Sequence, residues 1–143
     1  MSTALIHAAL SPSASGIHAR GAQTYFHTHV QSRTPMEIVV LLYDGAIRYL
    51  GQARTAMATN DLVTKRDALS RGLAIVTELQ GMLNLGEGGD IAARLDGLYT
   101  YIHGCCLEAN AQRDPARLDE AVRLLSTLRS AWAEIAGTPQ TAA

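Results

Sequence analysis

The sequence predicts an all-α protein, folded as an antiparallel up-down four-helix bundle with a flexible N-terminal segment. Apolar residues make up 48% of the chain but aromatic residues only 5%, and the abundant alanine and leucine favour helices over strands. Four segments between residues 35 and 137 repeat apolar side chains every three or four positions, which indicates amphipathic helices. The connections between these segments are short, so neighbouring helices should run antiparallel.

The first helix is predicted from Pro35 to about Met57. Thr34 provides a capping hydroxyl, and proline suits the first helical turn. With residues placed at 100° intervals, the apolar arc of this helix is roughly 200° wide, where one core face needs only about 100°. This helix therefore lies centrally in the bundle, or one of its sides faces a removable partner.

Turn and capping residues set the limits of the other three predicted helices. The second starts near Asp61 or Thr64 and ends near Leu83. A glycine-rich break over residues 84–89 follows, and Asp90 should cap the third helix. The fourth helix should begin at the Asp114-Pro115 pair, with Gly137 at its end.

The chain divides into one domain and two tails. A length of 143 residues fits a single domain. Residues 1–22 lack a sustained apolar period and are predicted to be a disordered tail. The bundle is expected over residues 23–137, with residues 23–33 as an N-terminal cap segment and residues 138–143 as a C-terminal tail.

Composition and charge argue against binding to nucleic acid and against insertion into a membrane. The net charge is −1, and the longest basic run is the pair Lys65-Arg66, so no cationic stripe for nucleic acid is present. Apolar runs are far shorter than the roughly 20 residues needed to cross a bilayer. The first ten residues lack a basic region and do not resemble a secretory signal. We therefore expect a cytoplasmic protein without membrane insertion.

No pattern of residues predicts an enzyme, a metal site or a cofactor. No glutamate is followed three positions later by histidine, as di-iron bundles require. His103 has no lysine or arginine within one turn, and it does not form a nucleophile–base pair with Cys105 or Cys106 at these spacings. The two adjacent cysteines are expected to be reduced thiols in or near a helical core, because a disulfide between them would strain the backbone.

Residues 42–50 and 124–132, with further segments in the same order, resemble the FliS family of flagellar export chaperones. Residues 42–50, Leu-Tyr-Asp-Gly-Ala-Ile-Arg-Tyr-Leu, resemble the signature of the family's first helix. Further similarity lies in Tyr25, Val30 and residues 32–35, in residues 98–101 with 109–110 and Asp114, and in residues 124–132. These matches are collinear over about residues 21–136, which makes their combination specific.

The resemblance implies a cytoplasmic four-helix chaperone. Members of this family bind the disordered C-terminal segment of flagellin, prevent premature polymerisation and keep the subunit competent for type III secretion. The partners expected from the resemblance are therefore the flagellin C-terminal segment and the flagellar export apparatus. A small homodimeric helical protein with a regulatory or structural role remains the alternative, because a spare apolar face can also be buried against a second copy.

The expected binding groove follows from the second apolar sector of the first helix and from the second helix. The candidate partner-binding residues are Val40, Tyr43, Ile47, Leu50, Met57, Ile75, Leu79 and Met82. Ordinary core packing is the alternative for each of them. Tyr25 and Val30 precede the bundle and are expected to fold over the groove as a displaceable cap when no partner is bound.

Overall fold

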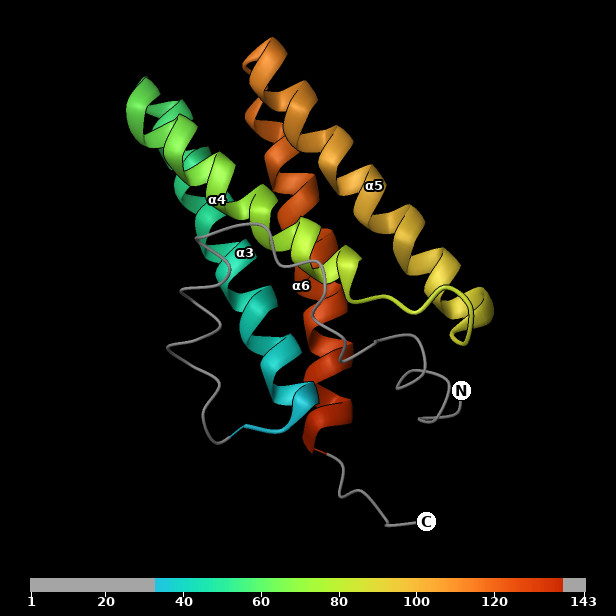
Figure 1. Cartoon of the computed structure of the whole chain (residues 1–143). Helices are drawn as coiled ribbons and strands as arrows, with labels where there is room; N and C mark the ends of the chain where they lie inside the picture. Colours follow the sequence, from blue (N-terminus) through green and yellow to red (C-terminus); the bar gives the residue numbers. More distant parts are fainter. Residues whose placement is uncertain (1–32, 138–143) are drawn as a thin grey trace.

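Four helices of alternating direction make up the described part of the chain. The computed structural model describes residues 33–137. Within them the helices are α3 (Pro35–Ala58), α4 (Leu62–Gly81), α5 (Gly89–Gln112) and α6 (Pro115–Gly137), and Figure 1 shows that successive helices run up and down. The prediction of an all-α bundle is confirmed. The tails and most of the cap segment, residues 1–32 and 138–143, lie outside the described residues.

α3 begins at its predicted cap, and α4 begins at Asp61, one of its two predicted start positions. Thr34 has an extended backbone, and its side-chain oxygen accepts a hydrogen bond from the backbone N–H of Glu37 at 3.2 Å. The carboxylate of Asp61 accepts from the N–H of Thr64 at 3.2 Å. Each bond satisfies an amide that the first helical turn leaves without a partner. These starts were predictable because capping depends on residues three apart in sequence.

The start of α5 differs from the prediction. Gly88 occupies the capping position without a side-chain hydrogen bond, and Asp90 lies inside the first turn instead of capping it. Gly89 has a φ of +56°, a backbone conformation that glycine adopts at little cost. The chain enters the helix through this backbone turn, so the carboxylate of Asp90 acts on the positive end of the helix dipole rather than as a cap.

The central position of α3 explains its broad apolar arc. α3 packs against both α4 and α6, while α5 packs against α6 and α4. The core contains apolar residues from all four helices, among them Leu42, Leu50, Ile75, Ile102 and Leu125. The sequence left two explanations for the wide apolar arc of α3: a central position in the bundle, or a side that faces a removable partner. Packing against two neighbouring helices accounts for most of the arc.

Two ion pairs join α3 to α6 at the surface. Arg129 Nε lies 2.6 Å from a carboxylate oxygen of Asp44, and Arg54 Nε lies 3.0 Å from Asp119. All four side chains are about 40% exposed, so each pair contributes on the order of 0–1 kcal/mol. These pairs favour the correct alignment of α3 on α6, whereas the buried apolar contacts supply most of the stability.

Candidate functional site

Half of the predicted partner-binding residues are enclosed in the core. Tyr43, Leu50, Ile75 and Leu79 have no exposed surface. In the described conformation they contact other helices of the bundle, so a partner does not reach them. The prediction that they line an open groove does not match this arrangement. The reason is that α4 and α6 both cover α3, which periodicity in one helix does not reveal.

The other half keeps partial exposure. Val40, Ile47 and Met57 on α3, and Met82 directly after α4, are partly buried and pack against the edge of the core. These four are the predicted residues that a partner can touch without opening the bundle. Tyr25 and Val30, the predicted cap, lie outside the described residues.

Tyr43 belongs to a buried hydrogen-bonded network across three helices. Its hydroxyl accepts the indole N–H of Trp132 at 3.1 Å and shares a hydrogen bond with the hydroxyl of Tyr99. The two tyrosine rings are tilted, with centroids 6.4 Å apart. Burial raises the pKa of Tyr43 to about 12 and raises that of Tyr99 well above its usual value. Both phenols therefore stay neutral and bind α3, α5 and α6 together.

Some exposed apolar side chains were not predicted as contacts. Leu62 and Val63 in the first turn of α4 are 46% and 76% exposed, and Leu107 on α5 is 61% exposed. Of these three, the exposure of Leu107 could have been predicted from the sequence. Leu107 follows the cysteine pair at a position that the helical period places away from the core. Single exposed apolar residues are common on protein surfaces. Leu62 and Val63 differ because they are adjacent and both exposed, near the end of α3.

An open pocket lies beside these residues, at the junction of α3 and α4. It has a volume of about 500 Å³ and contains none of the eight predicted partner-binding residues. Its lining comes from the polar side of α3, the turn and the start of α4: Arg48, Gly51, Gln52, Thr55, Ala56, Thr59, Asp61 and Thr64. The pocket is therefore separate from the groove expected from the sequence.

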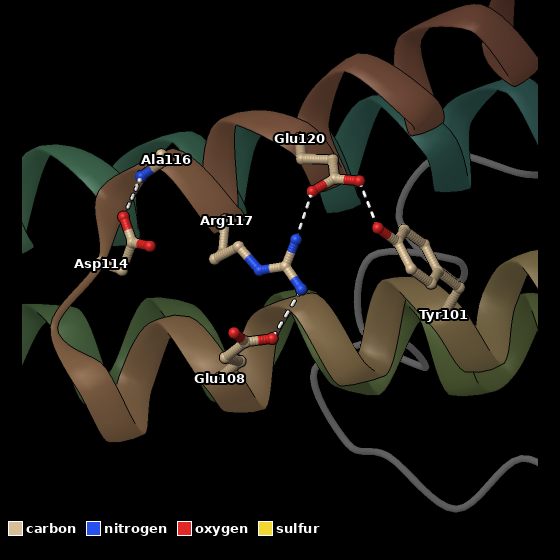
Figure 2. A network of polar contacts seen from close by, with 6 residues as sticks. All are labelled: Tyr101, Glu108, Asp114, Ala116, Arg117 and Glu120. Carbon is tan, nitrogen blue, oxygen red and sulfur yellow. Dashed lines mark hydrogen bonds and ion pairs between the residues drawn. The ribbon is translucent and has the colours of Figure 1, made fainter.

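A polar network fixes α6 on α5. Figure 2 shows Arg117 between two carboxylates, with Nη2 at 2.6 Å from Glu108 and Nη1 at 2.7 Å from Glu120. The hydroxyl of Tyr101 donates to Glu120. The pKa of Glu120 is lowered, first of all by the hydrogen bond from Tyr101 and then by the positive charge of Arg117. Both interactions favour the ionised carboxylate. The network links α5 to α6 near the turn that connects them, so its role is to hold these two helices together.

The cysteines and His103 show no catalytic arrangement. Cys105 and Cys106 are free and buried, as predicted, and burial raises the pKa of Cys106 to about 12. A thiol with a raised pKa remains protonated and is a poor nucleophile near neutral pH. His103 Nε2 lies 3.4 Å from the hydroxyl of Thr77, and burial lowers its pKa. Within residues 33–137 no cluster of three or more potential metal ligands occurs.

Among the described helices, none is both long and apolar enough to span a lipid bilayer. This finding concerns residues 33–137 alone.

Comparison with known proteins identifies the family of this chain. The family model described as "Flagellar protein FliS" matches residues 18–139. The chain belongs to the FliS family. A flagellar secretion chaperone FliS from Salmonella typhimurium is 37% identical over 85% of this chain and 90% of its own length. FliS from Vibrio cholerae is 33% identical over 76% of this chain and 79% of the relative.

A third relative extends the same assignment. The flagellar secretion chaperone FliSB from Pseudomonas aeruginosa is 32% identical over 77% of this chain and 87% of the relative. The resemblance found from sequence motifs is therefore confirmed at the level of the family. All three relatives are named flagellar secretion chaperones, and membership of their family supports a role as a flagellar export chaperone for this chain.

Proposed function

We propose that this chain is a cytoplasmic flagellar export chaperone that binds the disordered C-terminal segment of flagellin. Binding would prevent premature polymerisation and keep the subunit competent for type III secretion. The observation that carries the proposal is the family match over residues 18–139, together with relatives named flagellar secretion chaperones. The export apparatus is the second proposed partner.

The proposed mechanism is competition for apolar side chains. A flagellin segment that buries its apolar residues on the chaperone cannot use them for contacts with other subunits. Each fully buried leucine or isoleucine contributes roughly 1.5–3 kcal/mol, and ordering the segment costs about 2–5 kcal/mol. Many such side chains must therefore be buried to offset this cost and the loss of translational and rotational freedom on association, but no covalent chemistry is needed.

The burial of each predicted partner-binding residue decides whether we include it in the proposed contact surface. Val40, Ile47, Met57 and Met82 are partly exposed and open to a partner in the described conformation. Contact with Tyr43, Leu50, Ile75 or Leu79 would require α3 to separate from its neighbours, because these side chains are enclosed. We therefore assign the first contacts to the partly exposed set and propose the enclosed set only for a rearranged complex.

Co-purification tests the function directly. The full chain should retain full-length flagellin and lose it when the C-terminal segment of flagellin is removed. Equal retention of both forms would contradict binding to that segment. Retention of neither form, combined with a dimer that ignores flagellin, would favour the homodimeric alternative.

A matched pair of substitutions tests the surface. Ile47→Thr and Ile135→Thr change the same residue type at partly buried positions, one inside the proposed contact set and one outside it. Only Ile47→Thr should weaken the binding of a flagellin C-terminal peptide in calorimetry, while the two variants lose comparable stability. Equal affinity for both variants would remove Ile47 from the contact surface.

A further inference from the structure

The junction of α4 and α5 is the least closely packed of the contacts between neighbouring helices in residues 33–137. α3 packs far more extensively on α4 and on α6, and α5 packs more extensively on α6 than on α4. The connection between α4 and α5, residues 82–88, is also the longest of the three between the described helices, and Figure 1 shows it as an extended loop. Sparse packing is typical of the parts of a protein that open locally.

Polar side chains join α4 to α5 at the outer edge of this junction. We call them the α4–α5 seam: Thr77, Gln80, Asp96, Thr100 and His103. Gln80 Nε2 donates to Asp96 Oδ1 at 2.8 Å and to Thr100 Oγ1 at 3.1 Å. The hydroxyl of Thr77 lies 3.4 Å from Nε2 of His103. Because Thr77 and Thr100 are exposed, water can replace these partners, and such bonds add little net stability.

The contact of α5 with α6 is held more firmly. Figure 2 shows that Arg117 of α6 binds Glu108 of α5, and that Tyr101 of α5 donates to Glu120 of α6. The turn between these two helices consists only of residues 113–114. α5 can therefore move away from α4 while it stays attached to α6.

Buried residues lie directly behind the α4–α5 seam. On α4, Val76 is four positions before Gln80. On α5, Tyr99 is four positions before His103, and Cys106 is three positions after it. These spacings make the buried residues neighbours of the seam on each helix. Val76, Tyr99 and Cys106 have no exposed surface, so a movement of α5 away from α4 would uncover enclosed apolar surface.

We propose that the α4–α5 seam is a conformational gate, in which α5 swings away from α4 about its contact with α6. Gln80 holds the gate closed at its outer edge, and the hydrogen bond between Tyr99 and Tyr43 opposes opening from inside. The closed form is therefore the main one, and the open form exposes Val76 and Cys106 without unfolding the bundle. This opening belongs to the free chain and does not depend on the proposed binding of flagellin.

The two cysteines report on opposite sides of α5. Cys106 lies beside the seam, whereas Cys105 has a hydrogen bond with Tyr101 on the side of α6. Both thiols are buried, and the full chain contains two cysteines. The variants Cys105→Ala and Cys106→Ala therefore each leave one thiol. Its reaction with excess DTNB, at low urea concentrations, measures the opening that exposes it.

Each rate is compared with the global unfolding of the same variant. Cys106 in the Cys105→Ala variant should react roughly tenfold or more faster than global unfolding allows. Its rate should also respond less steeply to urea, because the gate exposes less surface than unfolding does. Cys105 in the Cys106→Ala variant should react only through global unfolding.

Two results of the labelling experiment would overturn the proposal. Reaction of Cys106 only through global unfolding would show that the seam does not open locally. Reaction of Cys105 as fast as Cys106, with the same weak urea dependence, would show that α5 also leaves α6, so that no swing about this contact occurs.

A matched pair of glutamine substitutions tests the role of Gln80. Gln80→Ala in the Cys105→Ala variant should speed the labelling of Cys106 by about 2- to 10-fold, because its bonds exist only in the closed form. Gln52→Ala changes the same residue type at an exposed position on α3 and should leave the rate unchanged. An unchanged rate for Gln80→Ala, or an equal increase for Gln52→Ala, would contradict the assignment of Gln80.

Discussion

Trp132 donates its indole N–H to the hydroxyl of Tyr43 across 3.1 Å, although the two residues are 89 positions apart in sequence. The same hydroxyl bonds to Tyr99, so one buried oxygen joins α6, α3 and α5. The core of this bundle is therefore specified by a polar contact as well as by apolar packing. Buried polar groups of this kind stabilise a fold only while every member has a partner.

Removing the central hydroxyl should destabilise the bundle. Tyr43→Phe leaves Trp132 Nε1 and the hydroxyl of Tyr99 without their buried partner, which we expect to cost about 1–3 kcal/mol in the free energy of unfolding. Urea unfolding measures the loss. The double variant Tyr43→Phe/Tyr99→Phe should lose less than the sum of the two single variants, because the second substitution removes a group already unpaired. Strictly additive losses would contradict the network.

Two glycines should respond in opposite ways to alanine. Gly72→Ala places a Cβ atom 2.7 Å from Cδ2 of Leu50, which is fully enclosed, so we expect a loss of about 1–3 kcal/mol. Gly51→Ala enters open space on α3 and should gain about 0.5–1 kcal/mol through higher helix propensity. Thermal unfolding of both variants checks the contrast, and a stabilised Gly72→Ala variant would show that Leu50 can move aside.

Stability should fall at alkaline pH. Burial raises the pKa of Tyr43 to about 12 from 10.0 and that of Cys106 to about 12 from 9.0. Between these limits the unfolded chain releases protons that the folded chain keeps, so unfolding becomes more favourable as the pH rises. Each group contributes a slope of about 1.4 kcal/mol per pH unit at most. The contribution is fully present below pH 9 and is lost progressively towards pH 12.

A pH series of urea unfolding measures this loss. Cys106→Ala is the matched variant, because it removes one of the two thiols whose ordinary pKa of 9.0 lies below that of tyrosine. Its stability should depend less on pH between 9 and 10, the ordinary values for cysteine and tyrosine, and should decline above that range. An identical slope for the variant and the wild type would show that Cys106 does not contribute.

Deletion of residues 1–32 tests the predicted cap. If Tyr25 and Val30 compete with flagellin for the same surface, the shortened chain should bind a flagellin C-terminal peptide with a higher association rate or affinity, because no competing contact must be displaced. Stopped-flow association measures the rate. The double variant Tyr25→Ala/Val30→Ala should reproduce the effect without shortening the chain. Unchanged rates in both variants would remove the cap hypothesis.

The sequence by itself determined the helices and most of their ends. Thr34 and Asp61 cap α3 and α4 through contacts with residues only three positions away, and such local contacts follow from residue order. That Cys105 and Cys106 form no disulfide with each other followed from their adjacency on a helix. The family could also be inferred, because four motifs lie in the same order as in its members.

Only the tertiary structure decided which apolar residues remain available to a partner. The helical period shows that Tyr43, Leu50 and Ile47 lie on apolar parts of α3, but it does not show what covers them. Packing of α4 and α6 on both sides of α3 enclosed Tyr43 and Leu50 and left Ile47 partly exposed. Burial is a property of several helices together, so it depends on contacts between residues far apart in the chain.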